Sequence, residues 1–125
     1  MLMREAHFPG RAPIEAYGNG GFRFADMSHR GSILCVQSGI YGWPVSDPGA
    51  ISADTLERVF DDGDRPELLL LGTGRALVPP APEMRSACSE QGVRIEVMDT
   101  GAAVRTFNVL LAEQRSVAAA LIAVE

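Results

Sequence analysis

Lysine is absent from this sequence, and acidic residues outnumber basic ones. All 11 positively charged side chains are arginine, against 16 aspartate and glutamate residues, so the net charge at pH 7 is −5. A general nucleic-acid binder needs a broad basic face, and this balance argues against one. It leaves room for a local basic patch, because Arg75, Arg105 and Arg115 can cluster in space. Arginine favours planar, two-point contacts with anions, although a GC-rich genome explains the bias more simply, and we favour that explanation.

Cysteines and histidines are few, and no apolar run is long. Cys35 and Cys88 lie in apolar segments and form no CxxC pair, which predicts buried thiols in a reducing compartment. His7 and His29 lack the spacing of zinc ligands, so we predict neither a metal site nor a cofactor. The longest apolar run, residues 117–124, is shorter than the roughly 20 residues that span a bilayer. Without a recognisable targeting segment, we expect a cytoplasmic protein that is at most peripheral at the inner membrane.

The length and composition predict one globular domain. The chain has 125 residues, of which 46% are hydrophobic and 22% are charged. A chain of this length can bury about two-thirds of its unfolded surface. We assign residues 1–125 to a single domain. Residues 1–13 form an N-terminal extension, whose composition is compatible with flexibility. No internal repeat or low-complexity segment divides the chain.

The first half of the sequence predicts β structure. Residues 14–27 alternate around Phe22 and Phe24, and residues 31–39 supply a second apolar run. Residues 28–31 between them have the composition of a turn, which predicts an antiparallel hairpin.

A glycine- and proline-rich segment follows over residues 39–52. It predicts an ordered loop, because it carries Tyr41 and Trp43. A short helix is expected next, over residues 53–60, with Ser52 as its N-cap and Gly63 beyond its end.

The second half predicts a β-α-β-α-β order. The expected elements are a buried strand at residues 68–71, a helix at 83–91, an alternating strand at 93–98, a helix that follows the cap Asp99 or Thr100, and a central strand at 117–124. Because crossover connections are right-handed, these strands belong to one mostly parallel sheet with helices on it. The antiparallel N-terminal unit then packs on this sheet or extends it.

Two glycine-containing loops form a candidate anion pocket. If their strands are adjacent and parallel, the loops face each other at the carboxyl ends of the strands. Backbone N–H groups, a helix N-terminus and an arginine would then surround an anion. The candidate residues are Gly72, Thr73, Gly74, Arg75, Asp99, Thr100, Gly101, Arg105 and Asn108.

Neither loop matches a phosphate-binding motif. Leu77 stands at the third glycine position of GxGxxG, prolines follow it, and no Walker A sequence is present. We therefore favour the alternative that Gly72, Gly74 and Gly101 serve tight turns and close packing. Thr73 would then satisfy backbone groups, as would Thr100. No nucleophile elbow or triad is visible, so no catalytic residue is assigned.

An aromatic pair beside a proline is the third candidate site. Tyr41, Trp43 and Pro44 are close in sequence. They can anchor a protein interface or plug one end of the core, and the sequence favours neither.

Several segments in this order resemble a known family. They are "GGFRF", "GIYGWP", "ELLLLGTGR" and "IEVMDTGAAVRTFNVLLAEQRSVAAALI". The chain from about Ile14 onward is similar to a family of small uncharacterised proteins whose mitochondrial members include an assembly factor for respiratory complex I. The resemblance implies a three-layer α/β fold, with a β unit packed on a mixed sheet flanked by helices. It also implies protein partners at the membrane arm of complex I and no established reaction.

Phe107 departs from the family pattern, in which a tyrosine is common at that position. The substitution removes a hydroxyl group, which weakens any mechanism that needs it. We therefore expect a non-enzymatic interaction protein that assists assembly of a larger, respiratory (complex I-type) membrane complex. The alternative is a small-molecule (anion) binding protein or enzyme that uses the loops at residues 72–75 and 99–105.

Overall fold

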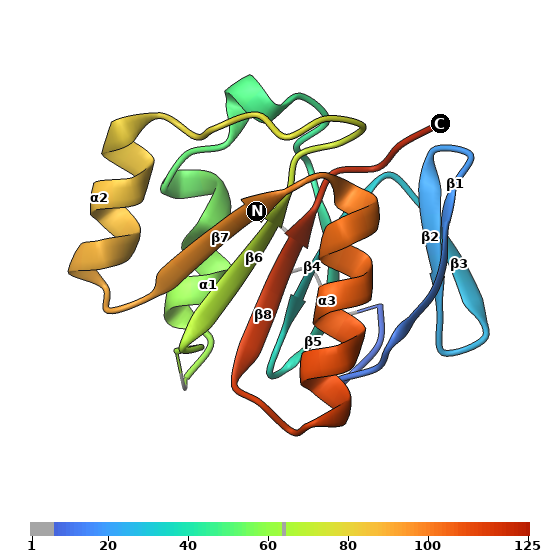
Figure 1. Ribbon diagram of the computed structural model, residues 1–125. Coiled ribbons are helices and arrows are strands. Elements are labelled where there is room, and N and C mark those ends of the chain that lie inside the picture. The colour runs from blue at the N-terminus through green and yellow to red at the C-terminus, as the bar shows by residue number, and fades with distance from the viewer. Residues whose placement is uncertain (1–6, 64) are drawn as a thin grey trace, which may run out of the picture.

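A five-stranded mixed sheet forms the centre of the computed structural model, which describes residues 7–63 and 65–125 (Figure 1). Its strands are β4 (Ser32–Val36), β5 (Gly39–Trp43), β6 (Leu68–Gly72), β7 (Arg94–Met98) and β8 (Val117–Leu121). Their order across the sheet is β5-β4-β8-β6-β7. Strand β6 pairs in parallel with both β7 and β8, whereas β4 is antiparallel to β5 and β8.

Helices and a second sheet cover the two faces of this central sheet. The helices are α1 (Glu57–Asp61), α2 (Pro82–Glu90) and α3 (Thr100–Ala112), and the second sheet contains β1 (Ile14–Gly18), β2 (Gly21–Phe24) and β3 (Met27–Arg30). Helix α3 lies in front of the central sheet with β1–β3 beside it, and α1 lies behind (Figure 1). Within the described residues, no helix has the length and apolar character needed to cross a membrane.

Alternate residues of the buried strands supply two cores. Leu70 of β6 packs with Phe107 of α3 and Phe24 of β2, whereas its neighbours Leu69 and Leu71 join the helices on the opposite face. Burial of both faces explains why β6 is apolar without alternation. The three layers confirm the predicted fold class, a mixed α/β arrangement with an antiparallel N-terminal unit packed on the main sheet.

The β-α-β-α-β order of the second half is confirmed, with small shifts at the ends of elements. The predicted strand at residues 117–124 ends at Leu121, and the helix predicted at 83–91 is α2 (Pro82–Glu90). Asp99 caps α3, since its side chain accepts a hydrogen bond from the Ala102 N–H. These elements were predictable because their apolar patterns and caps are local.

The predicted turn at residues 28–31 is wrong. Residues Met27–Arg30 form β3, which pairs with β2 instead of leading directly into β4. The hairpin turn lies at Ala25 and Asp26, whose φ values are 49° and 61°. Tight hairpin turns need such positive φ values, but they usually carry glycine or asparagine there. The amino-acid composition therefore indicated the wrong position for the turn.

The predicted loop at residues 39–52 is also partly wrong. Gly39–Trp43 form β5, an edge strand of the central sheet that pairs with β4. The helix predicted over residues 53–60 is instead a 3-10 turn, Asp54–Leu56, followed by α1. Glycine content favoured a loop here, but pairing with β4 overrides that preference.

The described part of the predicted N-terminal extension, residues 7–13, contacts the domain. The Ile40 N–H donates to the carbonyl of Phe8 at 2.9 Å, and the His7 N–H donates to the carbonyl of Ile40 at 2.8 Å. Arg11 donates to the carbonyl of Arg115 at 2.8 Å, and Ala12 is buried. Residues 1–6 of that extension lie outside the described residues.

Candidate functional site

The two glycine-containing loops lie side by side, because β6 and β7 are parallel neighbours. The Thr73 N–H donates to the carbonyl of Met98 at 3.0 Å, and the Thr100 N–H donates to the carbonyl of Gly74 at 2.8 Å. The premise that the loops follow adjacent parallel strands is therefore correct. The loops meet through their own backbone groups.

Thr100 connects both loops to the residue that follows β8. Its hydroxyl donates to the carbonyl of Ile122 at 2.7 Å and accepts from the Gly74 N–H at 2.9 Å, and its side chain is completely buried. The Ala102 N–H is likewise used, since it donates to Asp99 at 2.8 Å. These N–H groups, together with those of Thr73 and Thr100, already have protein acceptors.

Thr73 shapes the segment that follows β6. Its hydroxyl donates to the carbonyl of Ala76 at 2.6 Å and accepts from the Val78 N–H at 3.0 Å. These contacts hold a tight loop in which Leu77 and Val78 remain exposed. They agree with the interpretation that the threonines satisfy backbone groups.

Gly72 and Gly101 lie where another backbone or side chain approaches closely. A Cβ at Gly72 would lie 3.0 Å from the Thr100 Cα and 3.0 Å from a methyl group of Leu121. A Cβ at Gly101 would meet the hydroxyl of Tyr17. Gly74 has a φ of 100°, which side chains rarely adopt. All three positions fit the close-packing interpretation.

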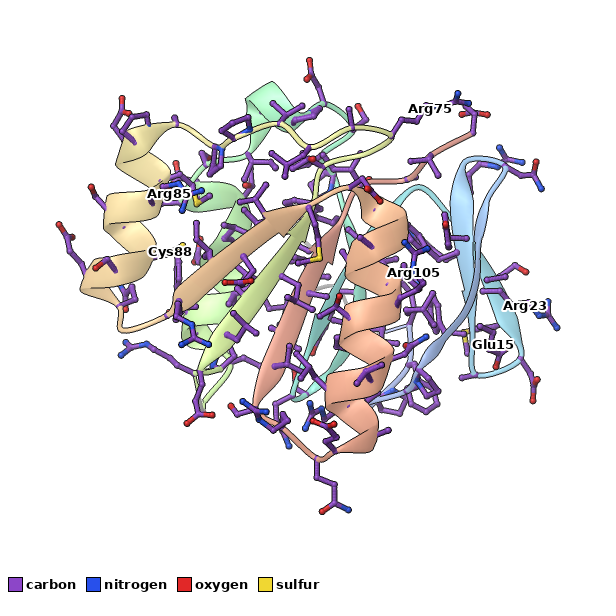
Figure 2. The ribbon with its side chains drawn as sticks, viewed as in Figure 1. Glu15, Arg23, Arg75, Arg85, Cys88 and Arg105 are labelled. Carbon is purple, nitrogen blue, oxygen red and sulfur yellow. The ribbon has the colours of Figure 1, made fainter. Side chains whose placement is uncertain are left out.

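The two arginines of the candidate pocket are exposed. Arg75 lies on the loop above the sheet, and Arg105 projects from α3 toward β1 and β2 (Figure 2). Within residues 7–63 and 65–125, neither guanidinium forms a salt bridge. Asn108 has a different role, because its side chain binds the backbone of Ile14 at 2.8 and 2.9 Å. The Asn108 side chain is therefore used to hold β1, and we do not group it with the two exposed arginines.

Tyr41 and Trp43 belong to the core on the α1 side of the sheet. Their exposed fractions are 8% and 4%, whereas Pro44 is exposed. The Trp43 indole N–H donates to the carbonyl of Thr55 at 2.8 Å, which ties β5 to the 3-10 turn. Trp43 therefore fills part of the core, which is one of the two roles that the sequence left open.

Arg58 is a residue of this region that the sequence did not reveal. Its guanidinium carbon lies 3.8 Å from the centre of the Tyr41 ring, a cation–π geometry. A hollow of about 330 Å³ lies beside it, lined partly by Pro44, Arg30 and Gly42. No sequence signal pairs Arg58 with Tyr41, because only the packing of α1 against β5 brings them together.

The two cysteine thiols lie inside the protein. Burial raises the pKa of the Cys35 thiol well above its ordinary value, and it raises the pKa of the Cys88 thiol while the nearby Arg85 partly opposes the shift. Both cysteines are free and buried. In the part of the chain that the structure describes, no three His, Cys, Asp or Glu side chains are grouped as metal ligands would be.

Comparison with known sequences gives one family match and a group of named relatives. The model of a family described as "Protein of unknown function (DUF498/DUF598)" matches residues 14–122. An uncharacterised protein of Rhodobacter capsulatus is 35% identical over 98% of this chain and 93% of its own length. NADH dehydrogenase [ubiquinone] 1 alpha subcomplex assembly factor 3 of Xenopus tropicalis is 33% identical over 87% of this chain. The match spans only 60% of that relative's length.

Solved structures with the same fold include close relatives in sequence. A crystal structure described as an outer membrane protein from Bartonella henselae has a TM-score of 0.90 and 59% identity, and covers 95% of this chain and 100% of its own. The Rpa2829 protein of Rhodopseudomonas palustris has a TM-score of 0.82 and 41% identity, over 98% of this chain and 90% of its own. A Bordetella pertussis protein with an Mth938-like domain has a TM-score of 0.78 and 29% identity, over 98% of this chain and 92% of its own.

Proposed function

This chain belongs to the DUF498/DUF598 family, and on that premise we propose that it assists the assembly of a respiratory membrane complex of the complex I type by binding partner proteins. The observation that carries the proposal is the likeness to assembly factor 3, which extends over 87% of this chain in the Xenopus protein. The family model matches residues 14–122, a range that contains the central sheet and both glycine-containing loops.

The assembly role can be tested in the organism that makes the protein. Deletion of its gene should lower the amount of intact complex I in native gels and the NADH:ubiquinone oxidoreductase activity of isolated membranes. Succinate oxidation in the same membranes serves as the control, because it bypasses complex I. A deletion strain with unchanged complex I content and activity would refute the assembly role.

We place the partner-binding surface at the rim of the hollow beside β5. Pro44 and the stacked guanidinium of Arg58 are accessible there, and they lie over the buried rings of Tyr41 and Trp43. Arginine is enriched among the interface residues that dominate binding energy, and the buried rings hold the Arg58 guanidinium in place. The Trp43 ring supports the rim from below and is not itself a contact.

Surface variants test this placement better than a core variant does. Arg58→Glu and Pro44→Asp should reduce recovery of complex I subunits with the tagged protein from detergent-solubilised membranes, whereas the exposed control Arg65→Glu should not. All variants must keep the wild-type melting temperature. Equal recovery with Arg58→Glu, Pro44→Asp and the wild type would remove the rim from the interface.

A second candidate function is anion binding by Arg75 and Arg105. The observation that favours it is that the Arg105 guanidinium lies near Gly101 in the first turn of α3, a helix end that attracts negative charge, and that Arg75 is exposed on the adjoining loop. Because the backbone N–H groups of Thr73, Gly74 and Thr100 already have acceptors, the arginines would supply most of the binding. A phosphate or nucleotide present at about 100 times its Kd should add about 2.7 kcal/mol to the stability. A screen without any shift in melting temperature, for the wild type and for Arg75→Ala alike, would exclude this candidate.

Location is part of the same proposal. We place the protein in the cytoplasm, with peripheral contact at the inner membrane where a respiratory complex is built. The description of the Bartonella henselae relative as an outer membrane protein points elsewhere. Fractionation decides between them: recovery in the soluble and inner-membrane fractions supports the proposal, and recovery in the outer-membrane fraction contradicts it.

A further inference from the structure

Strand β7 forms one edge of the central sheet and has a free side. Its only strand partner in the described residues is β6. The Arg94 N–H donates to the carbonyl of Glu67 at 3.2 Å, and the Met98 carbonyl accepts from the Thr73 N–H at 3.0 Å. Because the direction of backbone groups alternates along a strand, the N–H and C=O groups of Ile95 and Val97 point away from the sheet. Such an edge is a template for another strand.

The side chains of β7 carry opposite charges two residues apart. Arg94 and Glu96 are exposed, and both lie on the sheet face that carries α3, whereas Ile95 and Val97 face the α2 side. Among residues 7–63 and 65–125, Arg94 and Glu96 form no ion pair. The strand therefore offers one positive and one negative side chain whose charges are not matched within the protein.

We propose that β7 binds β7 of a second copy of this chain, antiparallel and about a two-fold axis at Ile95. In this register, the outward N–H and C=O groups of the two Ile95 residues meet as a hydrogen-bonded pair. Arg94 of each copy then lies opposite Glu96 of the other, at the closer spacing of a non-hydrogen-bonded pair. A symmetric interface requires self-complementary charges of this kind, and opposite charges across strands are favourable.

Neighbouring registers lack this match. An axis at Glu96 keeps backbone pairing, because Ile95 of each copy then lies opposite Val97 of the other, but it places two carboxylates opposite each other and sets Arg94 against Met98. An axis at Val97 also keeps backbone pairing, but it sets Glu96 against Met98 and leaves Arg94 without a partner. The charge pattern of β7 therefore selects one register from the alternatives.

Part of the edge strand β7 borders a hollow. A hollow of about 480 Å³ borders the first half of β7, lined by Gly92, Val93, Arg94 and Ile95 together with Arg85 and Ser89 of α2. In the proposed register, Val97 and Met98 of the second copy lie next to Val93 and Gly92. Figure 1 shows β7 at the outer side of the sheet, away from β1–β3.

The other edge of the sheet is a poorer place for a second copy. Strand β5 already pairs at Ile40 with Phe8. The hollow beside it is lined by Arg30 and Arg58, and its lining residues include no carboxylate. Two copies meeting there would bring like charges together. The partner-binding rim and the self-association edge therefore lie on opposite sides of the sheet.

Sedimentation equilibrium of the purified protein tests the proposal. Over about 1 μM to about 1 mM protein, we expect a reversible monomer–dimer equilibrium. Arg94→Glu should raise the dimer Kd at least tenfold, equivalent to about 1.4 kcal/mol, because it places acidic side chains opposite each other twice. Glu96→Arg should do the same with basic side chains. The control Arg23→Glu, on the far sheet (Figure 2), should leave the Kd unchanged.

A mixture of the two single variants supplies the decisive comparison. One copy then has two acidic side chains on β7 and the other has two basic ones, so the heterodimer regains both charge pairs. Equimolar Arg94→Glu and Glu96→Arg proteins should associate at least tenfold more tightly than either alone. Each variant is also measured alone. A folding defect would weaken association in the mixture as well, so it does not produce the tighter association expected there.

Amide hydrogen exchange of the wild type locates the contact. Exchange at Ile95 and Val97 should slow as the protein concentration rises, because those N–H groups become hydrogen-bonded in the dimer. A protein that stays monomeric throughout the concentration range overturns the proposal. So does a dimer whose Kd is indifferent to both charge reversals, or one in which the Ile95 and Val97 amides exchange at a constant rate.

Discussion

The side-chain amide of Asn108 in α3 holds the backbone of Ile14 in β1 by two hydrogen bonds. It accepts from the Ile14 N–H at 2.8 Å and donates to the Ile14 carbonyl at 2.9 Å. Two segments that are 94 positions apart in the chain are joined in this way. The contact attaches the three-stranded sheet to the helix that covers the central sheet.

Asn108→Ala should destabilise the protein by about 1–3 kcal/mol, because both partly buried backbone groups of Ile14 lose their partner. Asn108→Asp retains only the acceptor and should fall between the alanine variant and the wild type. Urea unfolding measures both. Val109→Ala is the control, since Val109 is 58% exposed on the same helix. If Asn108→Ala matches that control, the two-point contact contributes little to stability.

Thr100→Val should also cost about 1–3 kcal/mol, because it leaves the Gly74 N–H and the Ile122 carbonyl without their hydroxyl partner in a buried site. Thr100→Ser keeps the hydroxyl and should lose less. Thermal and urea unfolding of the two variants separate the contribution of the hydrogen bonds to stability from the contribution of packing by the threonine methyl group. A serine variant less stable than the valine variant would show that packing of the methyl group dominates.

Gly72→Ala and Gly101→Ala are the same chemical change in two surroundings. At Gly72 the new methyl group meets the backbone of Thr100 and a buried leucine, so a loss of about 1–3 kcal/mol is expected. At Gly101 it meets the end of the Tyr17 side chain, which is 41% exposed and can move. Alanine also favours the helix there by up to about 1 kcal/mol. Differential scanning calorimetry should therefore show a large loss only for Gly72→Ala, and equal losses would contradict this account.

The buried thiol of Cys35 makes stability depend on alkaline pH. Burial holds the pKa of this thiol above its ordinary value in the folded protein. In the unfolded chain, the pKa of the thiol is about 8.5. The stabilising effect is therefore fully present below that pH and is lost as the pH rises toward the folded-state pKa. The free energy of unfolding should fall by up to about 1.4 kcal/mol per pH unit for this thiol.

Urea unfolding in reducing buffer, at pH values on both sides of about 8.5, measures this loss. Cys35→Val lacks the titrating group and is the matched control, so its stability should decline less steeply than that of the wild type. If the stabilities of the two proteins decline equally with rising pH, groups other than Cys35 cause the loss of stability at alkaline pH.

Much of the second half of the fold was predictable because its signals are local. Four consecutive leucines before Gly72 indicated a strand covered on both faces, and Asp99 at the start of an apolar periodic segment indicated a capped helix. In the first half, the turn at Ala25 and Asp26 lacks glycine, and alanine rarely adopts the positive φ that it has there. The strand Gly39–Trp43 has a loop-like composition and exists because β4 pairs with it.

The candidate site was predictable only in part. Adjacent parallel strands were inferred correctly, and they bring the two glycine-containing loops together. Sequence could not show that the hydroxyl of Thr100 would accept the Gly74 N–H, or that Asn108 would bind Ile14 and not a ligand. Both depend on distances between segments that are far apart in the chain.

By itself, the sequence determined which segments are apolar and, in the second half of the chain, the order of strands and helices, because these follow from the order of neighbouring residues. Tertiary structure alone decided that Trp43 lies inside while Arg58 covers Tyr41, that the loops use their N–H groups on each other, and that β7 keeps a free edge. The reason is physical: burial and hydrogen-bond partners are set by what packs against a residue, and that neighbour is often far away in the chain.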